Sequence, residues 1–111
     1  MKCLKIDDKW LKLILGGKKT WEIRRTRTNF RGRIALGNTK SKNYDGYATI
    51  KDCIEFSVND LKKFGDKHQA TQFIDGYAGE KETLFAWVLS DIIPELKPKP
   101  CSYSPGSWCQ T

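Results

Sequence analysis

The stretch GGKKTWEIRRTRTNFRGR, residues 16–33, combines a glycine turn with an unusual density of basic side chains. It holds seven cations and one acid, Glu22, while the rest of the chain has thirteen Lys and Arg against twelve Asp and Glu. The net charge of +7 is therefore almost entirely local. A local excess of positive charge favours a binding face for a polyanion, and the alternative is a solvated basic loop.

A strand is predicted inside this stretch, at residues 20–25, because TWEIRR is rich in β-branched and aromatic residues. Successive side chains of a strand point to opposite faces. Glu22 and Arg24 should therefore share a polar face, while Trp21 and Ile23 point to the core. The apolar residues of an otherwise charged segment are explained in this way.

The residues that precede this stretch predict a strand followed by a helix. Residues 2–6 alternate polar and apolar side chains, which indicates a short strand. Asp7 or Asp8 can cap a helix whose apolar residues, within 10–15, fall on one stripe before Gly16 ends it. The glycine turn then delivers the basic residues into the second strand.

The residues that follow predict a strand-rich α+β domain. The order of the expected strands and helices predicts a small, strongly curved β-barrel of about five to six strands with two to three short helices. The length of 111 residues predicts one domain over 1–111. The remaining predicted elements are a strand over 33–39, a turn at Asp45 and Gly46, a strand over 47–56 with a bulge near Asp52, a helix over 58–64 capped by Ser57 and ended by Gly65, one or two helical turns over 70–77, a strand over 83–92, an irregular proline-containing tail over 94–105, and an edge strand over 107–109.

Several classes of protein are disfavoured by the composition. No signal peptide or membrane-spanning apolar run is evident, so a cytoplasmic protein without membrane contact is expected, with a monomer favoured. The four cysteines, Cys3, Cys53, Cys101 and Cys109, lack zinc-ligand spacing, and His68 is the single histidine. No metal and no cofactor are expected. Reduced thiols are favoured, although an even number of cysteines leaves disulfides open.

The chemistry of the basic stretch centres on Lys19 and Glu22. Surrounding cations favour the ionised form of Glu22, so it is better suited to orienting Arg24 or to accepting a hydrogen bond from a base than to acting as a general base. A surface Glu–Arg pair, worth about 0 to 1 kcal/mol, is the simpler alternative. Neighbouring cations should lower the pKa of Lys19, and a neutral amine can act as a nucleophile or a base. Most lysines beside a glycine turn do neither. Trp10, Phe30 and Tyr44 are aromatic residues that could stack a base or belong to the core.

Two motifs and two later segments of the chain match a known pattern. They are G-x-K-x-x-E-x-R at Gly17, Lys19, Glu22 and Arg24, T-x-F-R-G at residues 28–32, FAWVLSDI at 85–92 and GSW at 106–108. Over nearly its whole length the chain thereby resembles the ASCH domain family, which is related to the PUA RNA-binding fold. The resemblance implies a PUA-like β-barrel with a cleft beside the first helix, and binding of RNA or nucleotides.

An enzymatic function is implied by only part of this resemblance. Some bacterial members are amidohydrolases that remove the acetyl group from acetylated cytidine with a Lys, a Thr three residues later and a distant Glu; others are reported as ribonucleases. Lys19 matches the lysine, but Glu22 replaces the threonine, so that mechanism does not carry over intact. Glu80 and Glu82 are both candidates for the distant acid.

The expected function is therefore an RNA- or nucleotide-binding ASCH domain with a basic cleft. The first alternative is a small hydrolase acting on a modified nucleoside of the acetylcytidine type, or a ribonuclease, in which Lys19 and Glu22 would be catalytic. The second alternative is an interaction module for an acidic protein partner. The expected ligand-binding residues are Lys18, Lys19, Glu22, Arg24, Arg31, Trp10, Asn38, Thr39 and Lys40.

Overall fold

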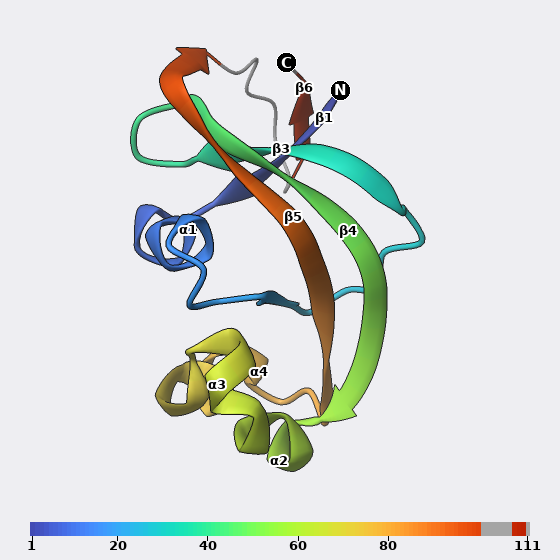
Figure 1. The fold of residues 1–111 in the computed structure, drawn as a ribbon. Helices are drawn as coiled ribbons and strands as arrows, with labels where there is room; N and C mark the ends of the chain where they lie inside the picture. Colours follow the sequence, from blue (N-terminus) through green and yellow to red (C-terminus); the bar gives the residue numbers. More distant parts are fainter. Residues whose placement is uncertain (101–107, 111) are drawn as a thin grey trace.

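A mixed six-stranded sheet, with the strand order β2-β5-β4-β3-β1-β6, organises the molecule (Figure 1). The computed structural model describes residues 1–100 and 108–110. Neighbouring strands run antiparallel except for β1 and β3, which pair in parallel. The strands are β1 (Lys2–Ile6), β2 (Trp21–Arg24), β3 (Gly32–Asn38), β4 (Asn43–Ser57), β5 (Thr83–Pro100) and β6 (Trp108–Gln110).

The segment from β1 to β2 has the predicted order of strand, helix, glycine turn and strand. Helix α1 (Asp8–Leu15) begins after Asp7 and is followed by Gly16. Gly17 then adopts a positive φ of 82°, a conformation that glycine reaches without steric penalty. The backbone N–H of Lys19 donates to the carbonyl of Leu13, so the turn folds back onto the helix. The start of β2 is therefore held close to α1.

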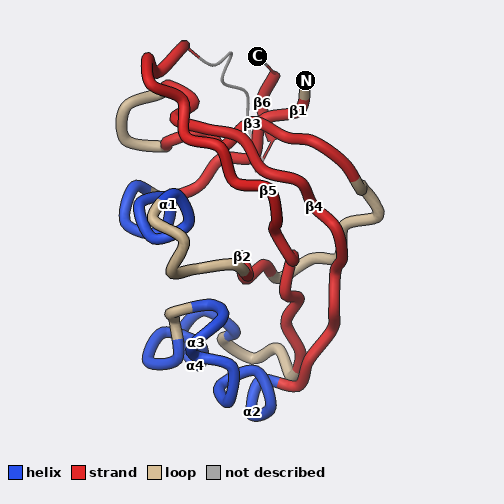
Figure 2. Tube along the Cα trace, viewed as in Figure 1, coloured by secondary structure: helices blue, strands red, loops and turns tan. Residues whose placement is uncertain are grey.

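A group of short helices connects β4 to β5 at the far end of these two long strands (Figures 1 and 2). The predicted cap is confirmed, because Ser57 Oγ accepts a hydrogen bond of 3.1 Å from the backbone N–H of Asp60. The predicted stop at Gly65 is wrong: its backbone stays in the right-handed helical region and begins a new helix. We call residues 58–78 the helical segment. It comprises α2 (Val58–Leu61), the 3-10 turn η1 (Lys62–Phe64), α3 (Gly65–His68), the 3-10 turn η2 (Thr71–Phe73) and α4 (Ile74–Ala78).

The prediction for the start of β4 is wrong in one respect. Gly46 lies inside the strand, opposite Leu36 on β3 and Pro94 on β5, and does not form a turn. A Cβ at Gly46 would lie 2.8 Å from the carbonyl oxygen of Ile93, so glycine is required here by close packing. The chain reverses instead at residues 39–42. The bulge predicted near Asp52 is confirmed by a register shift against β5.

The end of β5 also differs from the prediction. Residues 94–100 continue the strand and pair with the start of β4, where an irregular tail was predicted; residues 101–105 lie outside the described ranges. The strand tolerates prolines because β2 pairs only with residues 85–88, and among the described residues nothing pairs with that edge of β5 beyond them. The predicted final strand is confirmed as β6 at the opposite edge of the sheet, beside β1; residue 107 also lies outside the described ranges.

The α+β class is confirmed, whereas closure of the sheet into a barrel is not shown. Strands β2 and β6 end the strand order on opposite sides. The larger clusters of buried residues lie between the sheet and α1, including Leu11 and Ile14, and between β2, β5 and the helical segment, including Ile23 and Ile74; Cys3 and Ala35 form a small further cluster. Trp10 packs against both clusters. Among the described residues, no helix has the length and apolar character needed to cross a bilayer.

Candidate functional site

A cavity of about 530 Å³ opens between α1, β2 and the helical segment. Its charged lining comes from the first part of the chain, and its aromatic walls come from both α1 and the helical segment. Ile23, Ala70 and Ile74 supply apolar surface between them. The charged lining residues are Lys5, Asp7, Lys19, Glu22 and Arg24, and the aromatic ones are Trp10, Phe73 and Tyr77.

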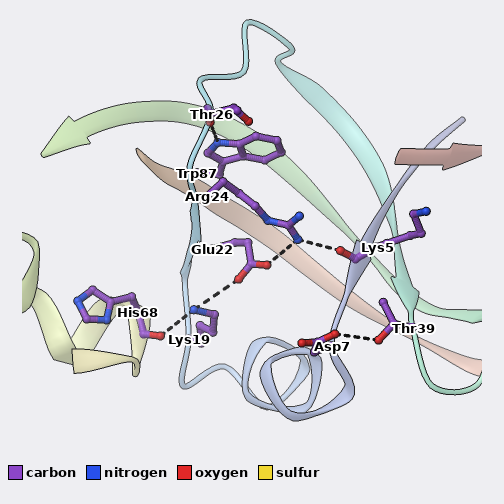
Figure 3. A network of polar contacts seen from close by, with 9 residues as sticks. All are labelled: Lys5, Asp7, Lys19, Glu22, Arg24, Thr26, Thr39, His68 and Trp87. Atoms are coloured by element: carbon purple, nitrogen blue, oxygen red, sulfur yellow. Dashed lines mark hydrogen bonds and ion pairs between the residues drawn. The ribbon is translucent and has the colours of Figure 1, made fainter. Parts of the chain in front are cut away.

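Lys19 lines this cavity, and its amine points between Glu22 and the carbonyl of His68 (Figure 3). The residue is 1% exposed. Its Nζ donates a hydrogen bond of 2.7 Å to the carbonyl oxygen of His68 and lies 3.6 Å from Glu22 Oε1. The centroid of the Trp10 ring is 5.0 Å away, within cation–π range. The amine is thus held by a backbone carbonyl, a carboxylate and an aromatic face.

Arg24 binds the other oxygen of the same carboxylate. Its Nη2 donates to Glu22 Oε2 at 2.7 Å and to the carbonyl oxygen of Lys5 at 2.8 Å (Figure 3). The guanidinium lies 5.7 Å from the ring centroid of Trp87, whose Nε1 in turn donates to the carbonyl of Thr26. Because Glu22 is only 6% exposed, one buried carboxylate separates two cations. We call Lys19, Glu22 and Arg24 the buried trio.

The pKa of Lys19 is lowered, as the sequence predicted, but for a different main reason. Burial is the largest cause, because a charged ammonium loses its hydration there. The carboxylate of Glu22 opposes this effect, and Arg24 adds only a minor further lowering. The crowding by cations that the sequence indicated is therefore secondary to burial.

His68 anchors the carbonyl that holds Lys19. Its ring is fully buried, with Nδ1 accepting from the backbone N–H of Ala70 and Nε2 placed 2.7 Å from the carbonyl of Leu61. Since Nδ1 accepts, the proton of the neutral ring belongs on Nε2, which donates to Leu61. Burial lowers the pKa of His68, which favours this neutral form. The imidazole links two backbone positions within the helical segment. The carbonyl oxygen of the same residue accepts the hydrogen bond from the buried trio.

Asp7 is a second acid that lines the cavity. Its Oδ1 accepts a hydrogen bond of 3.0 Å from Thr39 Oγ1 (Figure 3). Thr39, a predicted ligand-binding residue, does not line the cavity itself and contacts its lining through Asp7. Neither Glu80 nor Glu82, the sequence candidates for a distant acid, lines the cavity; both are exposed.

The other predicted ligand-binding residues lie away from the cavity lining. Asn38 is buried and shapes the turn after β3, donating to Asp8 and Asp45 and accepting from the backbone N–H of Lys40. Lys40 itself is exposed, as is Lys18. Arg31 donates to the carbonyl of Thr28 and lies 3.9 Å from Asp52. Of the predicted set, the structure brings together Trp10, Lys19, Glu22 and Arg24.

The seven cations of the basic stretch do not gather in one place. Only Lys19 and Arg24 line the cavity. The other five lie at separate places on the molecule. Lys18 is exposed, Arg25 lies against Tyr77, Arg27 pairs with Glu55, Arg31 with Asp52, and Arg33 donates to the carbonyl of Asp91.

Several lining residues were not identified from the sequence. Lys5 and Asp7 come from β1 and its end, while Phe73 and Tyr77 come from the helical segment. The spacing of four residues between the two aromatics places them on one helical face, and this was the available signal. Two candidate stacking residues, Phe30 and Tyr44, do not line the cavity. Within residues 1–100 and 108–110, no cluster of three or more potential metal ligands is present.

Fold and site together define a small α+β domain with an aromatic-walled cavity over a buried acid flanked by cations. The chain belongs to the ASCH domain family, whose match covers residues 4–99. It is similar to the crystal structure of an ASCH protein from Zymomonas mobilis, with a TM-score of 0.80 and 26% identity over 89% of this chain and 72% of that one. A single-substitution mutant of that protein aligns with a TM-score of 0.80, 26% identity and coverage of 89% and 74%. A second mutant aligns with a TM-score of 0.77, 27% identity and coverage of 89% and 72%. A search among curated proteins gave no match.

Proposed function

We propose that this ASCH domain binds RNA or nucleotides by receiving one base, or one nucleoside, in the cavity between α1, β2 and the helical segment. The observation that carries the proposal is the buried trio in the lining of an aromatic-walled cavity. A carboxylate held between two cations offers acceptors and donors side by side, which is the pattern that a base edge requires.

The size and walls of the cavity support a nucleoside. Pockets for small ligands are about 300 to 1,000 Å³ and mostly apolar, with a few polar groups that fix orientation; this cavity has about 530 Å³. Trp10 and Phe73 meet edge to face, with ring centroids 5.5 Å apart, and both rings line the cavity. Aromatic faces of this kind stack unpaired bases.

The buried trio retains hydrogen-bonding capacity for a ligand. Arg24 uses Nη2 for both of its hydrogen bonds, so Nε and Nη1 can donate to a ligand carbonyl or phosphate. A carboxylate has about four lone-pair sites, and Lys19 and Arg24 each approach one oxygen of Glu22. An exocyclic amine can therefore still reach Glu22.

The charges of the cavity lining determine how strongly salt should affect the binding of each ligand. Three cations and two acids line the cavity, so a free nucleoside should bind with little sensitivity to salt. A longer strand would also meet exposed cations, and its affinity should fall as the salt concentration rises. In this proposal the excess of basic side chains lies around the cavity, whereas the cavity lining itself has cations and acids in similar number.

Binding of each of the four ribonucleosides, measured by calorimetry, and of a labelled single-stranded RNA, measured by fluorescence anisotropy, tests the proposal. Glu22→Gln, confirmed as folded by circular dichroism, should change the order of preference among the four bases. Arg27→Ala is the matched control, because Arg27 pairs with Glu55 away from the cavity. No binding of any nucleoside or of the RNA would refute the proposal.

A second candidate function, hydrolysis of a modified nucleoside or of RNA, is favoured by the lowered pKa of Lys19. A larger fraction of neutral amine makes a lysine a better nucleophile or base. Glu22 stands where the amidohydrolase members have a threonine, which argues against the acetylcytidine mechanism. Incubation with acetylcytidine and with labelled RNA decides this: turnover lost in Lys19→Ala but kept in Arg27→Ala supports it.

Three further expectations belong to the same proposal. A PUA-like relationship of the fold, a monomeric state and a cytoplasmic location are included in it. Size-exclusion chromatography with light scattering measures the state of association. Competition of a bound partner by heparin, but not by short RNA, would instead favour an interaction module for an acidic protein.

A further inference from the structure

Two exposed cations, Lys9 on α1 and Arg25 after β2, lie beside the mouth of the cavity. Neither lines it, but each contacts aromatic rings that do. Phe73 is 40% exposed and Tyr77 is 38% exposed, so these rings form the rim and not the floor. The two cations therefore place positive charge just outside the cavity, at two positions on its rim.

Lys9 is held in place by two rings at once. Its Nζ lies 4.0 Å from the ring centroid of Phe73 and 4.7 Å from that of Trp10. Within the described part of the chain, it makes no ion pair with a carboxylate. An ammonium fixed by rings alone keeps its N–H donors for an anion from outside.

Arg25 is held by one residue through two kinds of contact. Its Nε donates a hydrogen bond of 2.7 Å to the carbonyl oxygen of Tyr77, and its guanidinium carbon lies 5.1 Å from the Tyr77 ring centroid. As for Lys9, no ion pair with a carboxylate is present among residues 1–100. The two Nη groups remain as a donor fork, the geometry that suits phosphate oxygens.

Nearby cations of the same types form ion pairs with acids, unlike Lys9 and Arg25. Lys12, one turn further along α1, lies 3.0 Å from Asp8 Oδ2. Arg27, two residues after Arg25, lies 3.1 Å from Glu55 Oε1. The two cations beside the cavity mouth thus contact rings and, among the described residues, no carboxylate. Their neighbours are paired with acids, including Arg27, which also lies 4.9 Å from the ring centroid of Phe85.

We propose that the cavity takes a nucleotide from within a single RNA strand, with Lys9 and Arg25 each contacting one of the two phosphates that flank its sugar. This inference rests on the proposed function and names its substrate class. The base enters between the rings towards the buried trio, and the backbone passes the rim without entering the apolar interior. A free nucleoside occupies the same cavity but cannot use either cation.

A series of ligands that differ only in phosphates tests this assignment. The probes are uridine, the dinucleotide UpU and the trinucleotide UpUpU, together with the same series for adenosine, cytidine and guanosine, none with terminal phosphates. The affinity of the wild-type chain should rise along the series. Each added contact should steepen the plot of log K against log salt by about 0.7.

Charge-removing variants assign the contacts to the two cations. Lys9→Gln and Arg25→Gln should each lower affinity for the trinucleotide about tenfold and reduce its salt dependence by one contact, while nucleoside affinity stays within about twofold. The double variant should bind trinucleotide and nucleoside with similar affinity. Lys12→Gln and Arg27→Gln are the matched controls and should resemble the wild type.

The possible failures are distinguishable. Nucleoside binding without any gain from added phosphates, or a gain that survives both substitutions, overturns the assignment of Lys9 and Arg25 and leaves the proposed function standing. An equal loss of nucleoside and trinucleotide affinity in Lys9→Gln also overturns it. Absence of binding by every nucleoside and trinucleotide overturns the proposed function and this inference together.

Discussion

Two parts of the basic stretch, built from the same kinds of residue, have opposite environments. In the buried trio, Lys19 is 1% exposed and Glu22 is 6% exposed, and the carboxylate of Glu22 is shared by Lys19 and Arg24. A few residues later, the ion pair of Arg27 with Glu55 has side-chain exposures of 54% and 45%. Water screens the second arrangement but not the first, so the same pairing of charges has very different energetic weight.

The contrast is tested most strongly by removing the acid in each part. Glu22→Ala leaves the buried Lys19 and the half-buried Arg24 without a counter-charge, and the free energy of unfolding should fall by about 3 to 5 kcal/mol. Glu55→Ala removes the acid of an exposed pair and should cost no more than about 1 kcal/mol. Urea denaturation followed by circular dichroism measures both. Similar losses in the two variants would contradict the contrast.

The next test concerns the charge on Lys19. Because the folded-state pKa of Lys19 lies below its ordinary value of 10.5, the unfolded chain binds the proton more tightly. The free energy of unfolding should therefore rise as the pH increases through the interval between the folded-state pKa and 10.5. Lys19→Met should lose this contribution, whereas Lys18→Met, at the exposed neighbour, should keep it. The measurement is urea denaturation at a series of pH values up to 10.5.

A smaller effect is expected from His68, which supports the buried trio through its carbonyl. Burial lowers its pKa below the ordinary value of 6.5, so the unfolded state takes up the proton first. Asp66 and Lys19 are the charged groups that act on the ring, in opposite senses. The stabilising contribution is complete above pH 6.5 and is lost as the pH falls through the folded-state value. Protonation would place a hydrogen on Nδ1, against the N–H of Ala70.

Thermal unfolding between pH 7 and pH 5 in the wild type and in His68→Gln checks this effect. His68 is the single histidine of the chain, so loss of most of the pH dependence in the variant identifies it. A variant that retains the full dependence would assign the effect to carboxylates instead.

The smallest effect is expected for the exposed pair itself. A double-mutant cycle with Arg27→Ala and Glu55→Ala should give a coupling energy of about 0.2 to 1 kcal/mol, and 1 M salt should reduce it. Urea denaturation with and without salt measures the coupling. A value that salt leaves unchanged would mean that this pair is shielded from water, as the buried trio is.

The sequence predicted most of the local structure around the site. The period of two placed Glu22 and Arg24 on one face of β2, and the stripe of apolar residues with the glycine turn predicted α1. The motif with Lys19 identified the family. These predictions succeeded because each depends on residues that are neighbours within one element or one turn.

Failures of prediction arose where distant segments meet. Gly46 was assigned to a turn from its neighbour Asp45, but packing against Ile93 of β5 makes it a strand residue. Phe73 and Tyr77 carried no sign that they face the residues of β2. Their spacing indicated a helical face, and no local pattern states which surface that face covers.

Composition and spacing along the chain were enough to predict the strand that carries Glu22 and the local concentration of charge, and the sequence motifs indicated the resemblance to the family that the comparison confirmed. Lys19 is buried and Arg24 is half-buried, whereas Arg27 and Arg31 are paired on the surface. This partition came from how α1, β2 and the helical segment pack. Burial depends on atoms brought together from positions about fifty residues apart, such as Lys19 and the carbonyl of His68 (separation 49). Hydration lost through that packing, and not the order of the residues, sets the charge behaviour of the site.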